Sequence, residues 1–227
     1  MRTIKTLIVG AAVVGSAAIA NAIPALYIST TGAAGSYTEV ATSASGLVTY
    51  STTSGPGVWT IQIDSGETKP VLSTATSPAM DLGIIASSTG VGSLYVAFED
   101  IGFDTAAIGE LMSIGGHIVS GAAETYSFES FADTANTQAT TTLPTGSVLG
   151  SPLTGSFSST TSGGSELVTL PNSSAYALGV IVEITAAGAT STSIDASLEP
   201  VPDGGATALL LGAALSGLAL LKRKLTA

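Results

Sequence analysis

Carboxylates are the side chains of this sequence that could do chemistry, and three of them stand close together. Glu99 and Asp100 are adjacent at what we predict to be a strand end, and Asp104 follows Asp100 by four residues. Two carboxyl groups that flank a cleft can hydrolyse a glycosidic bond. Carboxylates and loop carbonyls can instead bind Ca²⁺, although the spacing here does not match an EF-hand loop. The third interpretation, a solvated turn without a ligand, is the one that we expect.

Other kinds of catalysis have little support in the sequence. The chain has one histidine, His117, and no cysteine. A Ser-His-Asp triad could use His117, but no nucleophile elbow of the G-x-S-x-G type accompanies it. Zinc sites need further histidines or cysteines. We therefore expect no catalytic residue, no enzyme activity and no cofactor, with calcium at Glu99, Asp100 and Asp104 as the one metal left open.

The distribution of charge limits the partners of the chain. Between Ile23 and Glu199 there are fifteen acidic residues and a single basic one, Lys69, a formal balance of −14. Such a surface repels phosphates, so we expect no binding of nucleic acid. Sugar binding usually employs exposed aromatic rings, but the only tryptophan, Trp59, is in phase with Ile61 and Ile63 and is predicted to be buried.

Short strands must position these side chains. Apolar residues alternate with polar ones in GVWTIQI, SLYVAFE and STSIDASL, and ALGVIVEI near residue 180 is a fuller apolar run. Period-two patterns bounded by Gly, Pro, Asn and Ser are typical of strands with one buried face. Turns are predicted at four places: Ser54-Gly55-Pro56-Gly57, Ser65-Gly66, Ser162-Gly163-Gly164 and Pro171-Asn172.

Two segments are less regular. Residues 105–114 are the best candidate for one or two helical turns, and residues 133–165, rich in Thr, Ser and Gly, form either a long loop or irregular edge strands. With strand centres roughly 10 to 15 residues apart, we predict one all-β domain over residues 23–199, an antiparallel β-sandwich of jelly-roll or Greek-key type. An N-terminal signal helix and a C-terminal transmembrane helix would flank it.

The N-terminus is typical of a secretory signal peptide. Arg2 and Lys5 precede an apolar stretch, and Ala20-Asn21-Ala22 matches an A-x-A cleavage site. A membrane-anchored N-terminal helix is the alternative. We predict that residues 1–22 are the signal peptide and that cleavage follows Ala22.

The C-terminal residues 200–227 combine a turn, an apolar segment and a basic cluster. The turn is Val201-Pro202-Asp203-Gly204-Gly205, residues 206–221 carry no charge, and Lys222-Arg223-Lys224 follow. An apolar stretch of this length is a marginal membrane span, since a hydrocarbon core needs about 17 to 25 residues. The basic cluster would stay on the cytoplasmic side of the membrane, so the preceding domain would lie on the other side.

This three-part tail resembles the PEP-CTERM family of bacterial sorting signals, in the variant that reads V-P-D. The resemblance implies recognition and processing by an exosortase, an integral membrane enzyme, after a transient inner-membrane stage. In the commoner motif, proline follows the acidic residue, whereas Gly204 follows Asp203 here. An ordinary single-span anchor is the alternative.

The middle of the chain resembles a group of uncharacterised exported PEP-CTERM proteins. The resemblance rests on SGETKPVLSTATSPAMDLG, on GSLYVAFEDIGF and on STSIDASLEPVPD, with Asp100, Gly102 and Phe103 in the pattern L-x-V-x-x-x-D-x-G-F. It implies no known activity.

These observations predict an exported protein of the cell surface or exopolysaccharide layer with a structural or interaction role. Two alternatives stay open. One is a carbohydrate- or calcium-dependent matrix-binding module, which needs an exposed aromatic strip or converging carboxylates. The other is a secreted polysaccharide hydrolase, which needs two carboxyl groups flanking a cleft.

Overall fold

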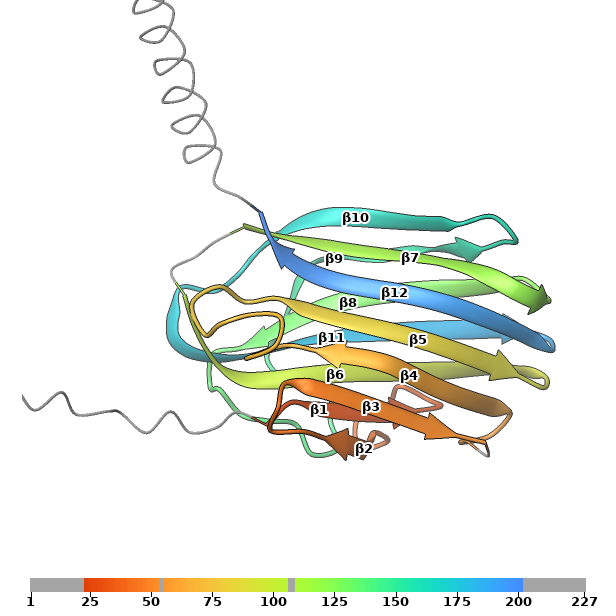
Figure 1. Cartoon of the computed structure of the whole chain (residues 1–227), viewed down its shortest axis with the longest axis horizontal. Coiled ribbons are helices and arrows are strands. Elements are labelled where there is room, and N and C mark those ends of the chain that lie inside the picture. Colours follow the sequence, from red (N-terminus) through yellow and green to blue (C-terminus); the bar gives the residue numbers. More distant parts are fainter. Residues whose placement is uncertain (1–22, 54, 106–108, 202–227) are drawn as a thin grey trace, which may run out of the picture.

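Alternating apolar side chains place most of the chain in β-strands, as a computed structural model of residues 23–53, 55–105 and 109–201 shows (Figure 1). The predicted signal peptide, with Ala20 and Ala22, and residues 202–227 lie outside these described residues. The strands of the described residues are β1 (Ala25–Ser29), β2 (Thr38–Thr42), β3 (Leu47–Thr52), β4 (Trp59–Glu67), β5 (Met80–Ser88), β6 (Val91–Thr105), β7 (Gly109–Gly121), β8 (Glu124–Asp133), β9 (Ser147–Phe157), β10 (Ser162–Thr169), β11 (Ser173–Ala187) and β12 (Thr190–Pro200).

The strands form two antiparallel sheets that face each other, which confirms the predicted sandwich (Figure 1). The first sheet has the order β2-β1-β6-β11-β8-β9, and the second has the order β10-β7-β12-β5-β4-β3. From β5 onwards the chain passes between the sheets at every connection except the β8–β9 hairpin. The resulting rows, β5-β12-β7-β10 over β6-β11-β8-β9, are the eight strands of a jelly roll. Strands β1 to β4 widen both sheets on the side of β5 and β6.

The apolar face of each strand lies between the two sheets, as the alternation predicts. Leu94, Val96 and Phe98 of β6 are fully buried, and Trp59 of β4 is 2% exposed. The Trp59 indole N–H also donates a hydrogen bond of 3.0 Å to the carbonyl of Ser93. Each fully buried side chain of this size contributes about 1.5 to 3 kcal/mol through removal from water, so this central layer holds the sheets together.

Three local predictions were wrong, because pairing with neighbouring strands overrides the local sequence signal at each place. Residues 109–114 are part of strand β7 and form no helix. Ser65-Gly66 lies within β4, where the register against β3 and β5 shifts, so this pair makes a bulge and no turn. The residues of Ser162-Gly163-Gly164 pair with β7 as the first part of β10.

The segment 133–165 contains both of the predicted alternatives, a loop and edge strands. Residues 134–146 are a loop, whereas β9 and β10 are the edge strands of their sheets. The loop lies against the outer face of the first sheet, where a second apolar cluster includes Tyr27, Phe131, Ala139 and Leu143. The buried Tyr27 hydroxyl donates a hydrogen bond of 2.6 Å to the carbonyl of Ala139. The loop is thus fixed on the sheet and forms one wall of a groove on this face.

Candidate functional sites

Asp100 forms a buried ion pair with Lys69. Asp100 is 0% exposed, and its Oδ2 lies 2.7 Å from the Lys69 Nζ, whose side chain is 13% exposed. The Thr68 hydroxyl and the Ile101 backbone N–H also donate to this carboxylate, at 3.2 Å and 2.8 Å. Burial raises the pKa of Asp100 and lowers that of Lys69, and the attraction between the two opposes both shifts.

The surroundings of this ion pair explain the D-x-G-F pattern. The Lys69 ammonium lies 3.7 Å from the centroid of the Phe103 ring, as a cation–π contact requires, and it donates to the carbonyl of Ile101 at 2.7 Å. Gly102 has a φ of 78°, a conformation that favours glycine. These residues connect the segment after β4 to the end of β6, so the D-x-G-F pattern has a structural role.

Glu99 faces the opposite side of β6 and fixes the loop of residues 134–146. It is 0% exposed. Its carboxylate accepts a hydrogen bond of 2.7 Å from the Ala139 N–H and one of 2.6 Å from the Thr145 hydroxyl. Burial raises the pKa of Glu99, against these hydrogen bonds. The predicted solvated turn is therefore wrong for Glu99 and Asp100, because both are buried within a strand.

The calcium candidates do not converge. Glu99 and Asp100 bind partners on opposite sides of β6, while Asp104 is exposed and its N–H donates to the carbonyl of Ala75 at 2.7 Å. In the described residues, no group of three or more His, Cys, Asp or Glu side chains could hold a metal ion. His117 lies in β7 opposite Ser193 of β12, on the outer side of the second sheet.

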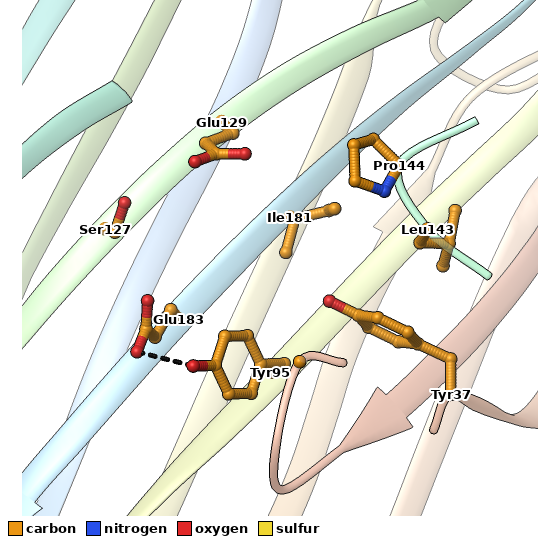
Figure 2. Close-up of a pocket in the computed structure, with 9 residues that line it drawn as sticks. Tyr37, Tyr95, Ser127, Glu129, Leu143, Pro144, Ile181 and Glu183 are labelled. Carbon is orange, nitrogen blue, oxygen red and sulfur yellow. Dashed lines mark hydrogen bonds between the residues drawn. The ribbon is translucent and has the colours of Figure 1, made fainter. Parts of the chain in front are cut away.

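A groove on the outer face of the first sheet brings together polar side chains that the sequence analysis did not select (Figure 2). It has a volume of about 180 Å³ and a floor that includes Ile181 of β11. Register explains the grouping. Glu183 of β11 lies opposite Tyr95 of β6 and Ser127 of β8, and Ile181 lies opposite Glu129 of β8. The two glutamates are thus diagonal neighbours, with Cβ atoms roughly 7 Å apart.

The β1–β2 loop and the loop of residues 134–146 complete the groove. Tyr37, just before β2, and Leu143 and Pro144 line it on the side away from Glu183 (Figure 2). The Tyr95 hydroxyl donates a hydrogen bond of 2.8 Å to Glu183 Oε1. Tyr37 is 3% exposed, and within the described part of the chain its hydroxyl makes no hydrogen bond.

The groove disfavours further negative charge. Burial, followed by the nearby charge of Glu183, raises the pKa of Glu129. Burial also raises the pKa of Tyr37 to about 12, with smaller contributions from Tyr95, Glu129 and Glu183. For Tyr95, burial and the hydrogen bond to Glu183 raise the pKa to about 12. A group that donates hydrogen bonds or carries positive charge would be stabilised here.

The predicted sorting motif begins where the last strand ends. β12 ends at Pro200, and the Val201 N–H donates a hydrogen bond of 3.1 Å to the carbonyl of Gly109, the first residue of β7. Val201 itself is 42% exposed. Residues 202–227, with Pro202, Asp203, Gly204, Gly205 and the basic cluster Lys222-Arg223-Lys224, lie outside the described residues. In the part of the chain that the structure describes, no helix is long and apolar enough to span a membrane.

A family model described as the VPDSG-CTERM motif matches residues 200–225. Val201, Pro202, Asp203 and Gly205 carry the letters of that description, and Gly204 stands at the position of its serine. The match supports a PEP-CTERM-like C-terminal sorting signal, an exported protein and processing by an exosortase-like enzyme. A comparison with curated proteins gives no match to the chain.

Proposed function

We propose that the protein has a structural or interaction role at the cell surface or in the exopolysaccharide layer. An exosortase-type enzyme processes its tail during a transient inner-membrane stage. The observation that carries the proposal is the position of the matched motif, which starts at residue 200, the last residue of β12. Removal of the residues after Val201 would leave every described strand in place, so processing releases an intact domain.

The proposal assigns no catalysis to the domain. The adjacent pair Glu99 and Asp100 is fully buried and occupied by hydrogen bonds, so these carboxylates cannot flank a cleft. A polysaccharide hydrolase built on this pair would need both carboxyl groups to be accessible beside the substrate. Release of shorter oligosaccharides from exopolysaccharide by the purified protein would contradict this part of the proposal.

A second candidate function is that of a matrix-binding module for carbohydrate. The groove favours it, because it combines two tyrosines with two glutamates on an outer face of the sandwich. Protein sites for small polar ligands combine an apolar floor with a few converging polar groups in this way.

Localisation in the native host tests the sorting role. We expect the double variant Pro202→Ala/Asp203→Ala to accumulate in the inner-membrane fraction, whereas the unaltered protein reaches the cell surface or the medium. The physical reason is that the enzyme must recognise the residues between the folded domain and the apolar segment. Immunoblots of separated fractions measure the distribution.

Asp64→Ala is the matched control, because Asp64 is exposed on β4 and the substitution removes the same charge within the domain. This variant should be sorted normally. If the motif variant and the unaltered protein are sorted equally, the processing enzyme does not recognise Pro202 and Asp203.

A further inference from the structure

We propose that the groove on the first sheet binds an extracellular glycan that carries free amino groups, that is, a partly or fully deacetylated hexosamine polymer. The proposal names a ligand class for the interaction role above and rests on that role for its biological setting. It depends on three features of the groove: a tyrosine hydroxyl that borders it and has no hydrogen-bond partner among the described residues, two carboxylates with no basic residue in the described lining, and a hollow that continues along the sheet.

The Tyr37 hydroxyl is the first indication of a ligand. Its side chain is 3% exposed, and the hydroxyl borders the groove without a hydrogen bond in the described part of the chain (Figure 2). The hydroxyl oxygen is accessible from the groove, so it can donate a hydrogen bond to a ligand there or accept one from it. A ligand hydroxyl or amine in the groove would supply the missing partner.

The two carboxylates determine the charge of that ligand. Glu129 and Glu183 both line the groove, and none of its described lining residues is basic. Lys69, the one basic residue of the described domain, is occupied by Asp100. A glycan with carboxylate or sulfate groups would be repelled by this charge. A protonated sugar amine would instead form charge-assisted hydrogen bonds with the glutamates.

The shape of the groove suits a chain of sugars. Its volume of about 180 Å³ is small, below the roughly 300 to 1,000 Å³ of pockets for drug-sized ligands. A second, more open hollow of about 470 Å³ adjoins it and shares Ser127 and Glu183 with it. Thr125, Thr154 and Thr185 line that hollow and offer hydroxyls. One sugar unit could occupy the groove while its neighbour in the chain lies over the threonines.

Calorimetric titration of the full-length protein in a non-ionic detergent tests the proposal. The probe is a β-1,4-linked tetramer of glucosamine, titrated in the presence of EDTA, and the matched probe is the N-acetylated tetramer. We expect saturable binding of the amine form and binding about ten-fold weaker, or less, of the acetylated form. Loss of one charge-assisted hydrogen bond corresponds to a change of about ten-fold or more.

Variants separate the groove from the general negative charge. Glu129→Gln/Glu183→Gln should weaken binding of the amine form by about ten-fold or more. Glu39→Gln/Asp64→Asn removes two exposed charges elsewhere, on β2 and β4, and should leave binding within about two-fold. Tyr37→Phe deletes only the unpaired hydroxyl, so it keeps the fold and should still weaken binding about three-fold or more.

Three results would overturn the proposal: equal weakening in both double variants, equal affinity for the acetylated tetramer, or no binding by a protein that melts normally. None of these results bears on the sorting signal, because localisation of the chain is measured separately in the host. Normal sorting together with no binding would reject the ligand and keep the proposed export. The reverse combination would keep the ligand and reject the sorting role.

Discussion

Lys69→Met is expected to lower the free energy of unfolding by about 3 to 5 kcal/mol. Asp100 is 0% exposed, and Lys69 is the one oppositely charged partner that it has among the described residues, at 2.7 Å. Methionine fills the space of the lysine stem but leaves the carboxylate buried and unpaired. Removal of one partner from a buried pair is costly for this reason, while the intact pair contributes little net stability. The variant also loses the contact of the ammonium with Phe103.

Thermal unfolding of the purified protein measures the effect. In a domain of this size, 3 to 5 kcal/mol corresponds to a decrease in Tm of about 6 to 20 °C. The double variant Lys69→Met/Asp100→Asn carries no buried charge at this site and should recover a large part of the loss. A free energy of unfolding for Lys69→Met within about 0.5 kcal/mol of that of the unaltered protein would contradict the prediction. It would show that Asp100 does not need Lys69 to stay buried.

Glu110→Met is expected to raise the free energy of unfolding by about 3 kcal/mol at pH 7. Glu110 of β7 is 0% exposed, and neither carboxylate oxygen has a hydrogen-bond partner in the described part of the chain. Burial, assisted by the charge of Glu199, raises the pKa of Glu110 from 4.5 to about 8. Methionine has a similar volume and no charge to bury, so the penalty is removed.

The pH dependence of this effect has a defined sign. Below about pH 4.5 the carboxyl is protonated in both the folded and the unfolded chain, so Glu110 adds no penalty. Between about pH 4.5 and 8 only the unfolded chain releases the proton, and the stability of the folded protein falls as the pH rises. Above about pH 8 the penalty is constant. Denaturant unfolding from pH 4 to 9 should therefore show the two proteins diverging over this interval.

Glu39→Met is the control, since Glu39 is exposed on β2. Its stability should follow the unaltered protein across the range. The buried acids Glu99, Asp100 and Glu124 also have raised pKa values, so both curves will slope, and the difference between them isolates Glu110. A constant difference at every pH would show that Glu110 does not titrate as described.

Much of the fold could be predicted from local alternation, and the errors came from residues that break it. Ile194, Ala196 and Leu198 are buried as expected, because apolar and polar residues strictly alternate there. In β7 the inward position of Glu110 is charged while Leu111, which faces outward, is apolar and 37% exposed. The strand alternation is therefore inverted at these two positions, within the segment that the sequence predicts to be helical.

The groove could not be predicted because it depends on strand pairing over long distances. Tyr95, Glu129 and Glu183 come from three strands that are far apart in sequence and adjacent in the sheet. Each residue does lie on the side of its strand opposite the core residues, which was the only available signal. The tail differs in this respect, since its three parts are contiguous and the motif match at residues 200–225 needs no tertiary information.

The mass of the mature protein isolated from its native host tests the central claim most directly. Intact-protein mass spectrometry gives both termini in one measurement. We expect a C-terminus within residues 201–205, where the motif joins the end of β12 to the apolar segment. A mature surface protein that retains Ala227 would contradict the processing of this signal and leave the tail as a permanent anchor.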